Sequence, residues 1–487
     1  MSSFIPLQNL ANPAIRTLHY TWFAFFLTFV IWFGHAPLMA MIKAELLLSD
    51  AEVKTLLILN VALTIPARIA IGILVDKFGP RLAYSLLLAV SGALCIAFAS
   101  AQTFEQLALT RFLLGFVGAG FVIGIRLIAE WFPARQLGLA EGIYGGWGNF
   151  GSAAGALVLP ALAIGLAALG GWRAALVASG LLCILYALVF YRGVSNTPKG
   201  ATYFKPKRSG GLEVSSWGDL ALYYAITLPL WVALFVLVWK LSPAQLNLLD
   251  STWTSLAAIA VFAFAVSQSI GMWRVNAPRL REGVPAWERY PVRQVGILGI
   301  AYLAAFGSEI AVVSMLPLFF METFRLSPVI AGFSAAGFVV ANLIARPGGG
   351  WLSDLFGRRR ILSIQLAGIT IGYLLMSNMA SMTLPVALAI TFITSFFVQA
   401  ACGGVYAVIP LIQRRMTGQI AGMAGAYGNV GGVVFLTVLS FVDTQVFFLV
   451  LAATAAVAFI ASRFLEEPSG QMTEVLPDGT LQLIDVK

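Results

Sequence analysis

Charged residues are scarce in this sequence of 487 residues: Asp, Glu, Lys and Arg make up 10% of it, whereas ordinary soluble domains contain about 25%. Hydrophobic residues make up 60%, and the mean hydropathy is +0.89. A soluble protein of this composition would expose large apolar patches, which excludes a soluble enzyme. The apolar residues form continuous runs of about 20, the length of a membrane-spanning helix. We therefore expect an all-α polytopic membrane protein that is not an enzyme.

Cysteine and histidine are also scarce, with three and two residues. Cys95, Cys183 and Cys402 lie inside apolar runs without metal-ligand spacing, so we expect them to be buried small side chains. His19 and His35 have no partners with which to build a metal site. The sequence has no basic arm of the kind that binds nucleic acid. It therefore predicts no metal, no cofactor and no nucleic-acid partner.

Fourteen apolar runs of spanning length are present. They lie at about 20–41, 56–75, 83–102, 107–131, 139–166, 172–194, 219–240, 251–273, 294–321, 329–353, 361–380, 384–412, 419–442 and 444–463. If both termini are cytoplasmic, 21 of the 30 Lys and Arg residues fall on the cytoplasmic side, five outside and four within spans. This asymmetry is the one that fixes orientation in membranes. We expect a multi-pass protein of the plasma (inner) membrane, surrounded by lipid, with both termini cytoplasmic.

An internal repeat relates the first six runs to the last six. The second run of each group ends in a pattern of arginine, glycine, aspartate, glycine and arginine with the same spacing. The matched residues, offset by 278 positions, are Arg68 and Arg346, Gly72 and Gly350, Asp76 and Asp354, Gly79 and Gly357, and Arg81 and Arg359. Glycine-rich strings at 145–151 and 425–431 also match, offset by 280. This duplication resembles the major facilitator superfamily, whose two six-helix halves are parallel repeats.

The repeat predicts four segments, with two extra helices inserted between the halves. They are an N-terminal six-helix half at 1–194, a central linker at 195–293 with the two helices at about 219–240 and 251–273, a C-terminal six-helix half at 294–463, and a cytoplasmic tail at 464–487. We expect the inserted pair to form a peripheral hairpin without substrate contacts. The alternative is that both segments lie on the membrane surface. We expect the polar tail to lack a fixed fold.

The repeated loops predict a gating device. An aspartate at a helix end, a glycine at the turn and a following cation resemble the superfamily's loop motif, and this arrangement can latch neighbouring helices in one state. Glycines in the two strings allow helix backbones to approach closely and slide. The residues expected to act in gating are Asp76, Arg81, Asp354, Arg359, Gly148 and Gly428.

The two matched arginines point to an anion. Arg68 and Arg346 each precede their loop aspartate by eight residues, about 12 Å along a helix, which places both near the centre of an apolar core about 30 Å thick. A charge there costs at least about 2.5–3.5 kcal/mol. One alternative is that each pairs with a buried acid, but Glu130 and Glu141 are expected near helix ends and only Glu309 lies deep. The shortage of acids favours a small anion bound between the halves.

Two other buried arginines have simpler interpretations. Arg126 is expected to pair with Glu130, four residues later on the same helical face. Arg111, followed four residues later by Gly115, resembles another superfamily motif, and we interpret it as structural or gating.

The choice of arginine narrows the anion, because a guanidinium donates paired hydrogen bonds to planar oxyanions and stays charged. Nitrate and nitrite are flat and weakly hydrated, and Tyr302 and Phe306, one turn apart, are suited to clamp such an ion. The two glycine-rich strings that end in Gly-Asn-x-Gly, together with the arginine pair, resemble the nitrate/nitrite porter family of the major facilitator superfamily. The substrate-binding residues that this resemblance implies are Arg68, Arg346, Asn149, Asn429, Phe121, Tyr302 and Phe306.

The expected function is secondary active transport of nitrate, and of nitrite, by alternating access in a monomer. Uptake of an anion against a negative membrane potential needs a co-transported cation or exchange for another anion. We expect proton-linked uptake, with Glu309 and His35 as candidate proton carriers. The alternatives are nitrate/nitrite exchange, a carrier for formate or oxalate, or a nitrate-sensing receptor. The absence of Lys and Arg from 419–442 counts against an oxalate–formate exchanger.

Overall fold

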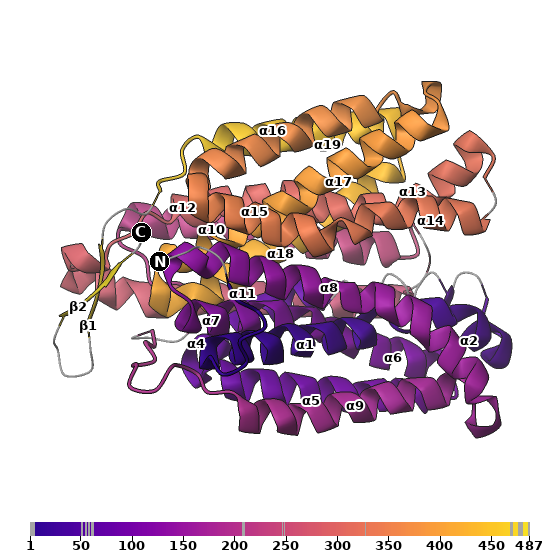
Figure 1. Ribbon diagram of the computed structural model, residues 1–487, viewed down its shortest axis with the longest axis horizontal. Helices are drawn as coiled ribbons and strands as arrows, with labels where there is room; N and C mark the ends of the chain where they lie inside the picture. The colour runs from indigo at the N-terminus through magenta and orange to yellow at the C-terminus, as the bar shows by residue number, and fades with distance from the viewer. Residues whose placement is uncertain are drawn as a thin grey trace.

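The computed structural model describes residues 5–49, 52–53, 56, 59, 63–206, 210–245, 247, 249–326, 328–467, 471–475 and 481–485. Helices occupy most of this part of the chain, so the predicted all-α architecture is confirmed. Figure 1 shows the helices of the N-terminal half, from indigo to magenta, beneath those of the C-terminal half, from orange to yellow. Both marked termini lie at the same end of the molecule.

The helices of the two halves follow the chain order of the predicted runs, and short helical turns between them are labelled η. The N-terminal half contains α1 (Pro13–Phe33), η1 (Ala36–Leu38), α2 (Met39–Leu46), α4 (Thr64–Phe78), α5 (Pro80–Ala99), α6 (Phe104–Leu114), η2 (Gly115–Ala119), α7 (Gly120–Trp131), α8 (Ala134–Gly165), η3 (Ala167–Leu169) and α9 (Trp172–Gly193). The middle contains α10 (Trp217–Leu241), α11 (Ser251–Glu282) and η4 (Ala286–Glu288). The C-terminal half contains α12 (Arg293–Tyr302), the π-helical turn η5 (Leu303–Gly307), α13 (Ser308–Phe324), α14 (Pro328–Val340), α15 (Asn342–Phe356), α16 (Arg358–Met376), η6 (Met379–Ser381), α17 (Leu384–Tyr406), η7 (Ile409–Leu411), η8 (Arg414–Met416), α18 (Thr417–Leu439) and α19 (Thr444–Ser462).

Eleven helices within the described ranges are long and apolar enough to cross a membrane. They correspond to eleven of the fourteen predicted runs. The other three runs, at 56–75, 329–353 and 361–380, contain α4, the pair α14 and α15, and α16. The count of fourteen spans is therefore not confirmed and stays a prediction, as do the four segment boundaries.

Two glycines make the tight turns that end α4 and α15. Gly79 has φ +89° and Gly357 has φ +95°, in the left-handed region that disfavours residues with a Cβ. The next helices begin at once, at Pro80 and Arg358. These equivalent turns hold α4 against α5 and α15 against α16 in the same way in both halves.

The two halves meet along two helix pairs, α8 with α15 and α4 with α18. Glycines make these approaches close, because a Cβ on Gly350 would collide with the backbone oxygen of Gly138, and one on Gly72 with that of Gly418. The two contacts are related by the sequence repeat. Small residues therefore allow the helices that carry Arg68 and Arg346 to pack directly against the opposite half.

The inserted pair packs on the C-terminal half. Both α10 and α11 are long enough to cross a membrane, and α11 is mostly exposed. The Tyr224 hydroxyl of α10 donates a hydrogen bond to the Ser269 carbonyl of α11 (2.8 Å). The Tyr427 hydroxyl of α18 donates to the Ile226 carbonyl of α10 (2.6 Å). The hairpin is thus attached to the outer surface of α18.

The linker on either side of this hairpin reaches both halves. The Tyr203 hydroxyl donates to the Val75 carbonyl at the end of α4 (2.7 Å), and burial raises the pKa of this phenol, which keeps it protonated. Glu213 pairs with Arg279 of α11 and with Arg415 of η8 (3.4 Å). The linker therefore connects the end of α4 to the start of α18.

The tail contains a two-stranded antiparallel sheet, formed by β1 (Gln471–Val475) and β2 (Leu481–Asp485). Gln471 lies opposite Asp485. The expectation that 464–487 lacks a fixed fold is therefore wrong for these strands. Neither five-residue strand alternates strictly between apolar and polar residues, so the sequence pattern does not distinguish these strands from a coil.

Candidate functional site

Arg68 lies on α4 with 1% of its surface exposed. Its Nε donates to the carbonyl of Gly118 in η2 (3.3 Å), and its Nη1 donates to the carbonyl of Gly425 in α18 (2.5 Å). Its guanidinium carbon lies 5.4 Å from the centre of the Phe306 ring. The charge is therefore held between the two halves, with an aromatic face beside it.

Arg346 lies on α15 with 2% of its surface exposed. Its Nη2 donates to the Tyr302 hydroxyl (3.1 Å), and its guanidinium carbon lies 5.1 Å from the centre of the Phe121 ring. Its Nη1 has no hydrogen-bond partner among the described residues. The side chain thus contacts one aromatic residue from each half and retains an unused donor.

Each arginine lies against the glycine string of the opposite half. A Cβ on Gly145 of α8 would lie 2.7 Å from Arg346 Nε, and a Cβ on Gly425 of α18 would lie 2.9 Å from Arg68 Nη1. The two glycines are separated by 280 positions, the offset of the repeat. The sequence repeat is therefore also a repeat of the site, in which glycine provides the space for a guanidinium.

Four rings connect the surroundings of the two arginines. Tyr302 and Phe306 are stacked, with centroids 5.1 Å apart and an interplanar angle of 6°. Tyr406 of α17 meets Tyr302 edge to face (4.9 Å) and meets Phe121 in the same way (4.6 Å). The rings of Phe121, Tyr302 and Phe306, all predicted as substrate-binding residues, thus form one cluster. Tyr406 was missed, because nothing distinguishes it within its apolar run.

No carboxylate of the described residues forms an ion pair with either arginine. Glu309 of α13 is buried, its charge acts on Arg346, and its Oε2 accepts no hydrogen bond from the described part of the chain. The alternative in which each arginine is paired with its own acid therefore does not describe this site. His35 lies elsewhere, at the start of η1, with its ring 6.3 Å from that of Phe98.

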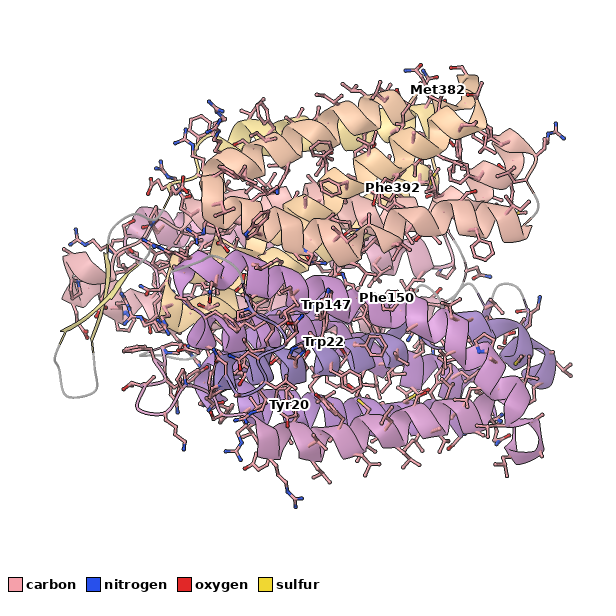
Figure 2. The ribbon with its side chains drawn as sticks, viewed as in Figure 1. Tyr20, Trp22, Trp147, Phe150, Met382 and Phe392 are labelled. Atoms are coloured by element: carbon pink, nitrogen blue, oxygen red, sulfur yellow. The ribbon has the colours of Figure 1, made fainter. Side chains whose placement is uncertain are left out.

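The asparagines of both glycine strings are buried, with Asn149 5% and Asn429 0% exposed. Neither amide atom of Asn429 has a hydrogen-bond partner in the described structure. Gly148 lies against Phe25 of α1, and Gly428 lies against the stacked rings of α12 and η5. Figure 2 shows the neighbouring Trp147 of α8 beside Trp22 of α1, and their rings meet edge to face at 5.4 Å. The strings thus pack against aromatic residues on equivalent helices.

Asp76 connects the end of α4 to the start of α18. Its two oxygens accept hydrogen bonds from the backbone N–H groups of Gly418 (3.0 Å) and Gln419 (2.9 Å). Its Oδ1 also lies 3.0 Å from Arg126 Nε. Arg126 pairs in addition with Glu130, as expected from their spacing. A carboxylate at a helix N-terminus is stabilising, so this contact holds the two halves together.

Asp354 makes the equivalent contact between the end of α15 and the start of α8. Its Oδ2 accepts from the backbone N–H of Leu139 (3.1 Å), and its Oδ1 accepts from Arg358 Nη2 (3.0 Å). Arg358 also donates to the carbonyl of Ala134 (2.6 Å). We call the Asp76 and Asp354 contacts the two interhalf latches.

The predicted loop cations do not take part in the latches. Arg81 donates to the Tyr191 carbonyl (2.7 Å) and lies over the ring of the same residue (4.1 Å). Arg359 is exposed. Arg126 and Arg358 contact the carboxylates instead, and sequence reasoning assigned neither of them this role. The Arg-Arg-Arg run at 358–360 indicates that a cation lies near Asp354, but it does not indicate which of the three arginines contacts the carboxylate.

The fold and this arrangement agree with the comparisons with known proteins. Residues 21–283 and 298–482 match the family described as Major Facilitator Superfamily. The chain belongs to the major facilitator superfamily. This superfamily member also resembles solved structures of the proton:xylose symporter XylE (TM-score 0.60, 16% identity, covering 94% of this chain and 97% of that one) and of FucP in the outward conformation (TM-score 0.61, 14% identity, covering 93% and 100%). These likenesses concern the fold.

Curated relatives of this superfamily member are closer in sequence. It is 44% identical to a nitrate/nitrite transporter, NrtP, of a Picosynechococcus species over 95% of both chains. It is 44% identical to the NrtP of Nostoc punctiforme over 93% of both, and 28% identical to high-affinity nitrate transporter 2.3 of Oryza sativa over 88% of this chain and 72% of the relative. The predicted membership of the nitrate/nitrite porter family is confirmed. The protein is a multi-pass membrane transporter and not an enzyme.

Proposed function

We propose that this protein transports nitrate, and nitrite, by alternating access, as a monomer in the plasma membrane with both termini cytoplasmic. The observation that carries the proposal is the pair of buried arginines, one from each half, without a carboxylate partner among the described residues. Both lie beside one cluster of aromatic rings. The relatives named nitrate/nitrite transporters support the choice of anion.

The geometry suits a small planar anion. Nη1 of Arg346 is an unused donor within the described structure, and a guanidinium offers donors in one plane to two oxygens of nitrate. The rings of Tyr302, Phe306 and Phe121 restrict the space around both cations. The amide of Asn429, which no described residue contacts by a hydrogen bond, supplies a further donor. A tetrahedral, strongly hydrated anion such as sulfate would lose more hydration energy in the same surroundings.

The two interhalf latches allow the transporter to alternate between a form that is closed at one end and a form that is open there. Both hold the halves together at the ends of α4 and α15, which closes this end of the molecule. Opening at this end requires Asp76 to leave α18 and Asp354 to leave α8. An anion bound by both arginines draws the halves together at the centre and compensates for the like charges there, so the empty and loaded carriers favour different arrangements.

Glu309 supports proton-linked uptake. It is buried on the same helix that follows Phe306, its charge acts on Arg346, and one of its oxygens has no partner in the described ranges. A carboxyl group in this position can load a proton together with the anion and release it after reorientation. Nitrate/nitrite exchange is the alternative mechanism, since exchange needs no titrating group.

The test is uptake by proteoliposomes that contain the purified protein. We expect the wild type to accumulate nitrate, and Arg68→Lys and Arg346→Lys each to lose uptake, because a lysine lacks the planar pair of donors. Arg360→Lys is the matched control, since Arg360 is exposed and should transport normally. Inhibition of nitrate uptake by added nitrite, formate or chloride ranks these anions by their affinity for the transporter. Normal uptake in either site variant would contradict the assignment of that arginine.

A further inference from the structure

A second group of buried polar side chains lies at the other end of the N-terminal half. Arg111 of α6 is fully buried; its Nε donates to the Leu56 carbonyl (3.3 Å), whereas its Nη1 and Nη2 have no hydrogen-bond partner in the described part of the chain. The same holds for both ring nitrogens of His35, which is 4% exposed, and for the indole N–H of Trp32, which is 3% exposed. Each of these three side chains thus has nitrogens that form no hydrogen bond with the described residues.

These side chains belong to one cluster. Trp32 and His35 are three residues apart at the end of α1, so they lie on the same face. The charge of Arg111 acts on His35 and also on Cys95 of α5. The ring of Phe98, one turn after Cys95, meets the His35 ring edge to face at 6.3 Å. The described carboxylates form no ion pair with Arg111.

Arg111 has fewer hydrogen-bond and ion-pair partners than two other buried arginines, Arg358 and Arg126. Arg358 donates to two backbone carbonyls and a carboxylate, and Arg126 pairs with two carboxylates. An arginine that only supports packing is satisfied in this way, because a buried cation without partners is costly. Within the described structure, Arg111 keeps two terminal nitrogens unused, in a cluster with an indole N–H that can only donate. An acceptor with several oxygens would satisfy this set of donors.

We propose that Arg111, His35 and Trp32 form a second site for the transported oxyanion, which the ion occupies on its way to or from the arginine pair. This inference rests on the proposed function. An anion at this site would accept hydrogen bonds from the Arg111 guanidinium and the Trp32 indole, and His35 would supply a third donor. Under the expected orientation, the site lies near the outer surface, and it precedes the central site during uptake.

A continuous row of aromatic side chains on α1 joins the two sites. Phe25 contacts Phe121 of the central cluster (5.2 Å), Phe29 contacts Phe25 (4.5 Å), and Trp32 contacts Phe29 (5.4 Å). The Trp32 ring also lies where a Cβ on Gly118 would be, and the Gly118 carbonyl accepts from the central arginine of α4.

The helix geometry sets the distance between the two sites. Arg111 precedes Gly118 by seven residues, about 12 Å along the end of α6 and the 3-10 turn η2. The second site is therefore close to the Gly118 carbonyl that accepts a hydrogen bond from Arg68 of the central site.

The experiment is equilibrium dialysis of the full-length purified protein against nitrate, with bound nitrate measured by ion chromatography. We expect two nitrate ions per wild-type chain, one per chain for Arg111→Gln, one for Arg346→Lys, and none for the double variant. Trp32→Phe keeps an aromatic side chain but removes the N–H donor, so we expect about tenfold weaker binding of one of the two ions with an unchanged elution profile. This variant decides the matter if Arg111→Gln fails to fold.

The results separate this inference from the proposed function. One nitrate per wild-type chain, retained in Arg111→Gln and in Trp32→Phe but lost in Arg346→Lys, would overturn the second site and leave nitrate transport intact. No nitrate bound by the wild type would overturn the proposed function itself. A second readout is the indole N–H resonance of Trp32, assigned by its absence from Trp32→Phe. Nitrate should shift it in Arg346→Lys, and an unchanged resonance would contradict the site.

Discussion

Replacing Asp76 with asparagine should open the latched end of the protein. Asp76 accepts two backbone hydrogen bonds from the start of α18 and pairs with Arg126. Asparagine keeps one acceptor oxygen, so one N–H loses its partner, and Arg126 loses one of the two carboxylates with which it pairs. Hydrogen bonds to charged groups contribute about 1.5–3 kcal/mol each, and we take about 2 kcal/mol for the loss. The equilibrium between closed and open forms should therefore shift about thirtyfold.

The assay uses a native cysteine. Cys402 of α17 is fully buried, and the adjacent Gly403 packs against the backbone of Arg346 and Gly350, between the arginine site and the latch. Labelling of Cys402 by N-ethylmaleimide, followed by mass spectrometry, should be about thirtyfold faster in Asp76→Asn than in the wild type. The other two cysteines, also buried, provide an internal comparison in the same spectra.

Asp443 provides the matched control. Its carboxylate also accepts a backbone hydrogen bond at a helix N-terminus, from Val446, but within one half of the protein (2.8 Å). Asp443→Asn should therefore leave labelling of Cys402 at the wild-type rate. Equal labelling rates in Asp76→Asn and Asp443→Asn would refute the reasoning, since the contact between the halves would then contribute nothing to closure.

Three further outcomes are expected in the uptake assay. Gly145→Ala and Gly425→Ala should each lose most nitrate uptake, because the new methyl groups would lie within 3 Å of a guanidinium nitrogen, whereas Gly165→Ala, where no described atom lies within 4 Å, should transport normally. Tyr302→Phe removes the hydroxyl that accepts a hydrogen bond from Arg346 and should raise KM for nitrate about tenfold. The melting temperature of this variant should equal that of the wild type. Glu309→Gln should abolish the stimulation of uptake by an imposed inward proton gradient; stimulation equal to that of the wild type would favour exchange.

The sequence predicts the fold well because two independent regularities agree. The apolar runs define helices, and the 278-residue repeat relates Arg68 to Arg346 and Asp76 to Asp354. Spacing along one helix fixes the depth of the arginines relative to the aspartates, so both features follow from the sequence alone. The structure then brings each residue to the opposite half, as a site between parallel repeats requires.

The partners of these residues could not be predicted, because they come from other helices. The cations at the latches are Arg126 and Arg358, whereas the loop pattern indicated Arg81 and Arg359. Arg358 begins α16 directly after the Gly357 turn, and only the geometry of that turn brings Arg358 beside Asp354 and leaves Arg359 exposed. Tyr406 is one aromatic residue within an apolar run, and only the packing of α17 shows that it contacts the site.

The helix pair α4 and α18 has a mechanical consequence. At one end of the pair Asp76 binds the first turn of α18, and eight residues away Arg68 binds the same helix at Gly425. An ion that draws Arg68 away from the Gly425 carbonyl weakens one of the two contacts between α4 and α18. A tilt of α18 relative to α4 would then act directly on the other contact, which Asp76 makes. In the proposed mechanism, ion occupancy is transmitted to the gate through this one pair of helices, without a chain of intermediate side chains.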